Sequence, residues 1–318
     1  MTPAFQGAWE RRRSAALLLT IALCSAGCGK DAGAALPAGS ATGAAVAASA
    51  RELPADVRIV AVGGAVTEIA FALGVGPRIV AADTSSTYPA QAAALPKVGY
   101  QRTLAAEGIA RERPTLLLLS AEAGPPAVIE QLRGLGVAMH IVPAEASVEG
   151  AKQKIRKVAE ALGEGSRGEA LVADLTAELA QAEARVRRAT TKPRVLFVYA
   201  RGAGTMMVSG VRTPAAEMIR LAGGENAVEG FEGFKPLTAE AASAARPDVI
   251  LIPALGLESI GGAAGLSAQP GIAQTPAGRA GRVVAMDDLL LLGFGPRLGR
   301  AVDELATRIH PELAGRNP

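Results

Sequence analysis

The chain has 318 residues, of which 49% are hydrophobic and only 3% aromatic, and its formal net charge is +3. This length suffices for one large or two ordinary domains, whose cores must be packed mainly with aliphatic side chains. The small charge and the absence of a basic stripe with interleaved aromatic residues argue against nucleic acid as a partner.

The N-terminus has the features of an export signal. Three consecutive arginines precede an apolar core at residues 15–23, which is too short to span a bilayer permanently. Small residues then lead to Cys28, as in a bacterial lipobox, although Ser25 stands where leucine is usual. We expect residues 1–28 to be a lipoprotein signal peptide ending at a lipidated Cys28, with ordinary cleavage nearby as the alternative. Residues 29–56 are rich in Ala, Gly, Ser and Pro and are expected to form a flexible tether.

Alternating strands and helices are predicted from residue 57 onward. Strands are predicted at residues 59–62, 116–119 and 137–142, and the second of these is a continuous apolar run, as expected of a buried parallel strand. Helices are predicted at residues 66–73 and 125–135, the second with proline near its start and glycine near its end. This alternation indicates βαβ units and a parallel sheet, which we assign to an N-terminal lobe at residues 57–146.

The pattern changes at residues 147–191, where Ala, Glu, Lys and Arg dominate and no strand is predicted. We expect a helical connector there, with helices at residues 148–162 and 169–188. The alternation then resumes in a C-terminal lobe at residues 192–313. Its strands are predicted at residues 194–199, 249–252 and 283–286, and its helices at residues 213–221 and 296–309.

The two halves share a sequence pattern. Glu107 is followed by Pro114 and an apolar strand, and Glu240 is followed at the same spacing by Pro247 and an apolar strand. A helical segment from Glu68 ends at glycine, and so does one from Glu217. Such a repeat predicts two similar lobes with a cleft between them, and binding sites favour clefts of this kind.

The loop at residues 83–99 carries the most conspicuous candidate residue. It follows an apolar strand and contains Tyr88, one of only three tyrosines in the chain. Loops at the ends of strands often present the site residues of α/β proteins. An ordinary turn, in which Tyr88 packs against Pro89, is an equally good interpretation of this loop taken alone.

No catalytic or metal-binding motif is recognisable. The chain has no GxSxG elbow, no P-loop and no dinucleotide fingerprint after a strand. Its two cysteines, Cys24 and Cys28, both lie in the export signal, and its two histidines lack partners at ligand spacing. Of these, His140 is expected in a buried strand and His310 at the end of the last helix. An exported two-lobed protein of this kind is expected to capture a small molecule, with an exported hydrolase as the rival hypothesis.

If the ligand carries iron, Tyr88 is the strongest candidate donor, because tyrosinate is a hard oxygen ligand that occurs as an axial ligand of haem. A neighbouring cation would favour the ionised phenol, and Arg102 is the nearest candidate in the sequence. Further candidate ligand contacts are apolar or cationic residues near the expected cleft, whose alternative roles are core packing and solvent-exposed charge. These are Met206, Met207, Arg212, Phe231, Phe234 and Lys235.

The chain resembles the periplasmic haem-binding proteins of bacterial haem ABC importers, within the wider group that binds cobalamin and ferric siderophores. The resemblance covers about residues 57–311. Its most specific part is the Thr-Tyr-Pro sequence within Asp-Thr-Ser-Ser-Thr-Tyr-Pro at residues 83–89. The other segments that carry it are residues 64–69, 95–100, 124–126, 231–238 and 292–297.

The resemblance implies an α/β fold in which two Rossmann-like lobes with parallel sheets are joined by a long helical backbone. It implies a carrier rather than an enzyme, which captures ferric haem b between its lobes with Tyr88 as the axial iron ligand. Some relatives also place a basic residue of the second lobe near the iron or its tyrosine ligand. Residues 252–257, which align there, contain none, so we expect iron ligation by Tyr88 alone. A ferric siderophore or cobalamin is the alternative ligand in the same fold.

The resemblance also implies partners. Glu107 and Glu240, one in each lobe, would form salt bridges with a two-fold permease dimer that works with ATPase subunits. A structural role is the alternative explanation, because a carboxylate in the first turn of a helix interacts favourably with the helix dipole. The protein would lie on the periplasmic or cell-surface side, and it would contact the membrane only through its lipid anchor.

Overall fold

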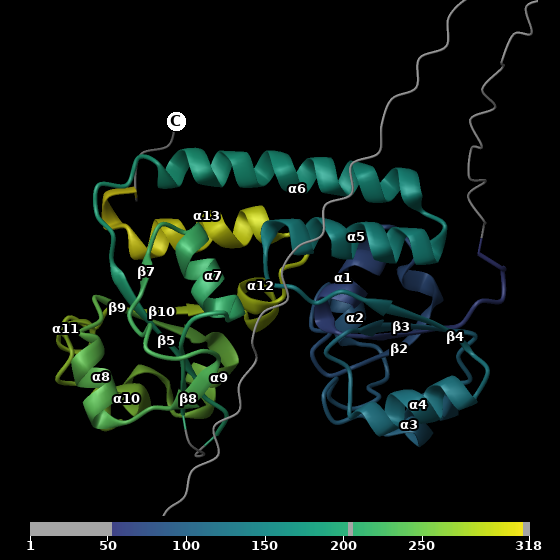
Figure 1. Cartoon of the computed structure of the whole chain (residues 1–318), viewed down its shortest axis with the longest axis horizontal. Helices are drawn as coiled ribbons and strands as arrows, with labels where there is room; N and C mark the ends of the chain where they lie inside the picture. Colours follow the sequence, from purple (N-terminus) through teal and green to yellow (C-terminus); the bar gives the residue numbers. More distant parts are fainter. Residues whose placement is uncertain (1–52, 203–205, 314–318) are drawn as a thin grey trace, which may run out of the picture. The chain divides into compact units, whose positions relative to one another are not determined.

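The computed structural model describes residues 53–202 and 206–313 (Figure 1). The expected signal peptide, Cys28 and nearly all of the expected tether lie outside the described residues. The described residues belong to one compact unit. None of the helices in this described part is long and apolar enough to span a membrane.

The first half of the fold is a parallel four-stranded sheet in the order β2-β1-β3-β4. Its strands are β1 (Ile59–Val62), β2 (Ile79–Ala82), β3 (Leu116–Ser120) and β4 (Ala138–Val142). Every residue of β1 and β3 is buried, because helices cover both faces of the sheet and each face needs apolar side chains. Helix α1 (Gly64–Ala72) packs on one face, and α3 (Ala106–Arg111) and α4 (Pro126–Gly134) pack on the other.

Strand β4 lies at the edge of this sheet, paired only with β3 among the described strands. His140 in β4 is exposed, so the expectation that it lies in a buried strand is wrong. An apolar run does not distinguish an edge strand from a central one, and only the position in the sheet decides the exposure of its side chains.

Two helices connect the halves: α5 (Val148–Leu162) and α6 (Gly165–Val186). Ser147 caps α5 by accepting a hydrogen bond from the backbone N–H of Gly150. The last long helix, α13 (Leu298–Ile309), runs alongside α6 (Figure 1). The approach is close, because a Cβ added to Gly299 would lie only 2.5 Å from Cβ of Glu178 on α6.

The second half contains a six-stranded sheet in the order β10-β9-β5-β6-β8, with β7 also paired to β5. Its strands are β5 (Arg194–Tyr199), β6 (Met207–Ser209), β7 (Glu225–Asn226), β8 (Phe234–Pro236), β9 (Val249–Pro253) and β10 (Val283–Met286). Strands β5, β7, β9 and β10 pair in parallel, but β6 pairs antiparallel with both of its neighbours, β5 and β8. The expectation of a parallel sheet therefore needs correction here, since the chain turns back directly after β5 instead of entering a crossover helix.

The remaining helices of the second half are short. They are α7 (Pro214–Leu221), α8 (Ala239–Ala245), α9 (Ala254–Ser259), α10 (Gly262–Ser267), α11 (Pro276–Arg279) and α12 (Asp288–Leu292). The short helix α2 (Ala90–Ala93) follows β2 in the first half. The predicted α/β class with a helical backbone is confirmed, and most predicted strands and helices match within two residues.

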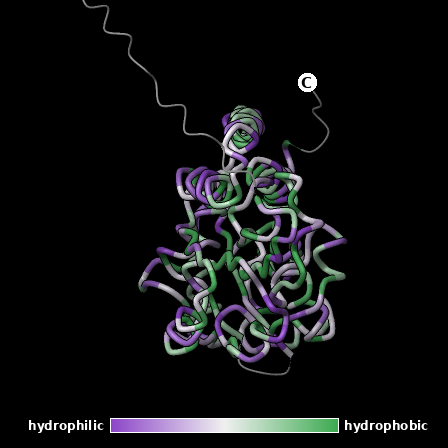
Figure 2. Tube along the Cα trace, turned by 90° about the vertical axis from the view of Figure 1, so that its right-hand side faces the viewer, coloured by the Kyte–Doolittle hydropathy of each residue, from purple (hydrophilic) through white to green (hydrophobic). Residues whose placement is uncertain are grey.

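One hydrophobic core extends through both halves. It contains side chains of β1, β3, β5 and β9 together with the buried faces of α5, α6 and α13. Two smaller cores lie on the opposite sheet faces, one in each half. In Figure 2 the interior of the trace is mainly hydrophobic, and hydrophilic segments lie mostly toward the outside. Because this shared core lies beneath the connecting helices, the halves cannot separate without exposing apolar surface.

The segment between α12 and α13 joins the second half to the first. The Lys154 ammonium on α5 donates hydrogen bonds to the carbonyl oxygens of Gly293 (2.8 Å) and Phe294 (3.1 Å). The Arg297 guanidinium donates to both carboxylate oxygens of Glu68 on α1, at 2.6 and 2.9 Å. We call these five residues the lobe junction.

Lys154 should make the stability of the protein depend on alkaline pH. Its side chain is 5% exposed, and burial lowers the pKa of Lys154 from 10.5 to about 8. Between these pH values the unfolded chain binds a proton that the folded chain has lost, so folding becomes more favourable as the pH rises. The difference in unfolding free energy between the wild type and Lys154→Met should grow by up to about 3 kcal/mol in favour of the wild type. Urea unfolding across this range measures it, and a constant difference would contradict the assignment.

Candidate functional site

The loop that carries Tyr88 is built around the buried carboxylate of Asp83. One oxygen of Asp83 accepts hydrogen bonds from the backbone N–H of Gly63 (2.9 Å) and the hydroxyl of Ser86 (2.8 Å). The other accepts from the backbone N–H and the hydroxyl of Ser85, at 2.9 and 2.6 Å. These bonds fasten the end of β2 to the start of α1. They explain why an aspartate followed by small hydroxyl residues precedes Tyr88.

Tyr88 lies where this loop meets the lobe junction. The Arg297 guanidinium lies 3.7 Å from the centre of its ring, and 42% of Tyr88 remains exposed. Arg102, expected from the sequence to be the neighbouring cation, instead forms an ion pair with Glu122 at 2.8 Å. The arginine on the Tyr88 ring therefore comes from the other end of the chain, where proximity in sequence could not reveal it.

A second arginine lies between the other two tyrosines. The Arg201 guanidinium, just after β5, lies 5.0 Å from the ring centre of Tyr100 in the first half. It lies 5.5 Å from the ring centre of Tyr199 in the second half. Each of the chain's three tyrosines thus has an arginine over its ring. We call Tyr88, Tyr100, Tyr199, Arg201 and Arg297 the tyrosine–arginine cluster, and it contains contacts between the two halves.

Residues 252–257 contain no basic residue, but another segment of the second half places Arg297 against the Tyr88 ring. Arg201, also of the second half, lies at Tyr100 and Tyr199. Arg297 is held by its ion pair with Glu68, whereas Arg201 is exposed and lies between two tyrosine rings. The scarcity of tyrosine, and the Tyr-Ala-Arg sequence at the end of β5, are the signals that could have drawn attention to Tyr199 and Arg201.

Burial and neighbouring charges shift the pKa values of groups around the cluster in opposite directions. Burial raises the pKa of Glu68, and its hydrogen bonds and charge interaction with Arg297 oppose that rise. Burial also raises the pKa of Tyr199, with the charge of Arg201 acting in the opposite direction. Burial raises the pKa of Asp288 as well, against the hydrogen bond from the backbone N–H of Leu255. The cluster is therefore partly shielded from water, which strengthens interactions between its charges.

The apolar residues and the lysine predicted to contact the ligand lie at different places in the second half. Met207 is half-buried and pairs with Tyr199 across β5 and β6, so it adjoins the cluster. Met206 is buried in the core of the second half. Phe234 packs edge-on against Phe197, with ring centres 6.3 Å apart, and Phe231 lies beneath the Lys235 ammonium at 4.6 Å. Ligand contact by Phe231, Phe234 and Lys235 thus gains no support from these contacts.

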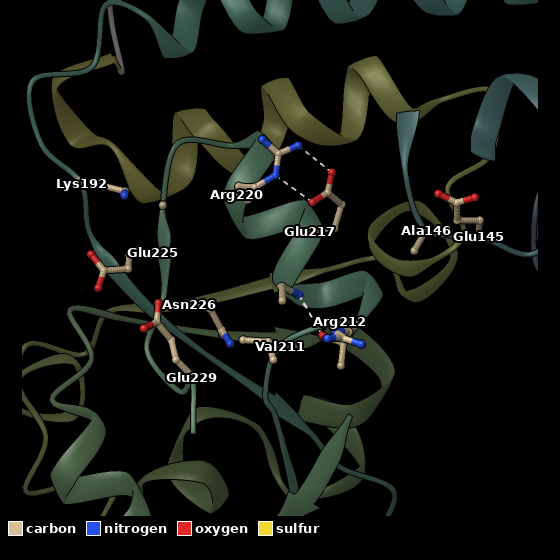
Figure 3. Close-up of a pocket in the computed structure, with 13 residues that line it drawn as sticks. Glu145, Ala146, Lys192, Val211, Arg212, Glu217, Arg220, Glu225, Asn226 and Glu229 are labelled. Carbon is tan, nitrogen blue, oxygen red and sulfur yellow. Dashed lines mark hydrogen bonds and ion pairs between the residues drawn. The ribbon is translucent and has the colours of Figure 1, made fainter. Parts of the chain in front are cut away.

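Arg212 forms an ion pair with Glu232 and lines a hollow of about 650 Å³ (Figure 3). None of the three tyrosines lines this hollow. Seven of its thirteen lining residues are charged, which does not suit a flat apolar ligand. They are Glu145, Lys192, Arg212, Glu217, Arg220, Glu225 and Glu229. Among the described residues, no group of three His, Cys, Asp or Glu side chains could hold a metal ion.

The two repeated glutamates occupy equivalent places in the halves. Glu107 lies in the first turn of α3, and Glu240 lies in the first turn of α8. Both are exposed, with Glu107 paired to Arg111 at 3.1 Å. Hydrogen bonds from its own backbone N–H and from Thr238 lower the pKa of Glu240. Both helices pack on the sheet face opposite the shared core.

Residues 59–290 match the sequence profile of the family described as periplasmic binding proteins. The chain belongs to this family. A solved structure of the periplasmic heme-binding protein RhuT from Roseiflexus sp. RS-1 is 47% identical, with a TM-score of 0.79 over 81% of this chain and 99% of that chain. The heme-binding protein BhuT, solved in complex with two hemes, is 48% identical, with a TM-score of 0.76 over the same shares.

More distant curated relatives belong to ABC transporters or bind vitamin B12. The uncharacterized ABC transporter substrate-binding lipoprotein YvrC of Bacillus subtilis is 26% identical over 77% of each chain. A vitamin B12-binding protein of Vibrio parahaemolyticus is 24% identical over 53% of this chain and 60% of its own. A periplasmic binding protein, rather than an exported hydrolase, is therefore confirmed as the class of this chain.

Proposed function

We propose that this chain captures haem between its two lobes and delivers it to the permease of an ABC importer. The observation that carries the proposal is the exposed ring of Tyr88, fixed on a loop built around Asp83 and lying against Arg297 of the other half. The family and the two heme-binding structures at 47% and 48% identity support it. The cargo would be ferric haem b, with the phenolate of Tyr88 as its axial ligand.

The remainder of the tyrosine–arginine cluster suits the other parts of such a ligand. Arg201 would pair with a haem carboxylate, since guanidinium and carboxylate bind well through two hydrogen bonds. Tyr100 and Tyr199 would pack against the macrocycle, together with the half-buried Met207. Contacts by the other candidates stay predictions: Arg102, Met206, Arg212, Phe231, Phe234 and Lys235.

We assign the lobes to residues 57–146 and 192–313 and the connector to residues 147–191. The single core beneath both sheets supports a connector that holds the lobes rigidly, so that little closure accompanies binding. Residues 1–28 would direct the chain out of the cytoplasm and leave it anchored through a lipid on Cys28. Residues 29–56 would then tether the binding unit to the membrane.

The first prediction concerns the iron ligand. Replacing Tyr88 with Phe keeps the ring but removes the phenolate oxygen. Hemin affinity should fall by at least about tenfold, and the charge-transfer absorption of ferric haem with an axial phenolate should disappear. Absorption titration of the mature domain with hemin measures both effects, and its end point gives the number of haems bound. A matched control is Tyr100→Phe, which should retain the charge-transfer absorption. An unchanged spectrum in Tyr88→Phe would refute the ligand assignment.

The alternative cargo is cobalamin or a ferric siderophore, and the vitamin B12-binding relatives favour cobalamin. Binding of cobalamin would not require a phenolate ligand such as Tyr88, because the cobalt of cobalamin already has ligands of its own. Competition between hemin, cobalamin and a ferric siderophore on the same protein separates the cases. We expect only hemin to bind in a way that depends on Tyr88.

The second prediction concerns delivery. Glu107 and Glu240 are proposed to bind cationic side chains of a permease dimer, since both lie exposed at equivalent helix starts. The double variant Glu107→Lys/Glu240→Lys should abolish haem uptake by cells, because like charges would then face each other. Its hemin affinity should match the wild type. A suitable control is Glu130→Lys/Glu258→Lys, which reverses exposed charges outside the repeat. Normal uptake by the first double variant would exclude this docking role.

A further inference from the structure

We propose that Arg113 and Arg246 form a second pair of docking residues, which bind carboxylates of the permease. One lies in each half, just after the helix whose first turn carries Glu107 or Glu240. The inference rests on the proposed function, because it extends the proposed contact with a two-fold permease dimer. The docking surface then presents two glutamates and two arginines in a symmetric arrangement. We call Arg113 and Arg246 the repeated arginines.

The sequence repeat preserves the two ends of this helical segment and little between them. Residues 107–113 read Glu-Gly-Ile-Ala-Arg-Glu-Arg, and residues 240–246 read Glu-Ala-Ala-Ser-Ala-Ala-Arg. Only the first and the last residue of each segment are identical in the two halves, and proline follows both segments. The intervening residues include charged side chains in one half and only small side chains in the other. The two halves therefore share an arginine at one fixed position relative to the docking glutamate.

Both repeated arginines have the left-handed backbone conformation, with φ of 48° for Arg113 and 44° for Arg246. This conformation ends a helix, but it is unfavourable for a residue with a Cβ atom, so glycine or asparagine is usual there. The need to end the helix therefore does not explain why both halves have arginine at this position. Both side chains are exposed, and neither forms an ion pair with any residue that the structure describes.

Other arginines perform the structural task at these helix ends. The Arg58 guanidinium, just before β1, donates a hydrogen bond to the carbonyl oxygen of Glu112 at 2.8 Å. The Arg194 guanidinium, at the start of β5, donates to the carbonyl oxygen of Ala245 at 3.2 Å. A favourable interaction with the helix dipole is the structural alternative for the repeated arginines. That interaction requires a positive charge but no particular position relative to the glutamate at the other end.

The repeat favours a two-fold protein partner over the membrane surface. Helices α3 and α8 both lie on the side of the molecule away from α6, so their exposed ends can meet one partner (Figure 1). The equal spacing of glutamate and arginine in the two halves suits a dimer that presents the same groups twice. Anionic lipid head groups attract any exposed cation and impose no such spacing. Because guanidinium and carboxylate pair through two hydrogen bonds, acidic side chains of the permease are the expected contacts.

The test removes the two charges and keeps the backbone conformation, since asparagine tolerates the left-handed region. The double variant Arg113→Asn/Arg246→Asn should lower the rate of haem uptake by cells at least about tenfold. Its hemin affinity and its urea unfolding midpoint should not fall. Arg113→Lys/Arg246→Lys keeps the charges and should retain part of the uptake. The matched control is Arg133→Gln/Arg279→Gln, which removes exposed cations from the last turns of α4 and α11 and should leave uptake unchanged.

A binding measurement distinguishes the permease from the lipid. Hemin-loaded wild type should bind membranes from cells that make the importer more tightly than membranes from cells that lack it. The asparagine double variant should lose this difference. An equal loss of binding to both kinds of membrane would identify lipid as the partner and overturn the inference.

The outcomes also separate this inference from the proposed function. Wild-type uptake by the asparagine double variant would overturn the inference, and so would an equal loss of uptake in the matched control. Failure of the wild type to bind hemin, or normal uptake by Glu107→Lys/Glu240→Lys, would instead overturn the proposed function. Circular dichroism of each variant checks folding. If the double variant is unfolded, the single variants Arg113→Asn and Arg246→Asn decide, and normal uptake by both overturns the inference.

Discussion

The ion pair between Glu68 and Arg297 is the contact on which the site depends. It connects the first helix of one half to the start of the last helix of the other, and it lies directly against Tyr88. Burying two charges is costly unless each satisfies the other, so the pair requires the close fit that Lys154 and the Gly293–Arg297 segment provide. The position of the candidate iron ligand and the alignment of the lobes therefore have one structural cause.

The shared core determines how such a protein can work. Side chains from both sheets meet beneath α5, α6 and α13, and a large hinge motion would expose them to water. Under the proposed function, recognition of the cargo would come from groups already in place, and the tyrosine–arginine cluster is the proposed set. Recognition by the proposed permease would likewise depend on fixed surface features. The repeated glutamates meet this condition, because each is held at the start of a packed helix.

Local sequence patterns predict most of the fold and draw attention to the loop that carries Tyr88. The strands at residues 59–62 and 116–119 are recognisable as unbroken apolar runs, and the Tyr88 loop contains an aspartate followed by small hydroxyl residues. Contacts across the halves were not accessible in this way, since Glu68 and Arg297 are 229 residues apart. The antiparallel turn after β5 could not be predicted from local patterns either, because β6 and β8 are only three residues long. His140 shows the same limit, because its exposure follows from the edge position of β4.

The most direct test of the central claim is to locate the iron in crystals of the hemin-loaded mature domain by anomalous diffraction at the iron absorption edge. The account predicts a peak between the two halves, at bonding distance from the Tyr88 hydroxyl oxygen and on the side of the ring away from Arg297. A peak bonded to Tyr100 or Tyr199 in place of Tyr88 would contradict the assignment of the ligand. A peak in the charged hollow beside α7 or on the outer surface would contradict capture of haem at the tyrosine–arginine cluster.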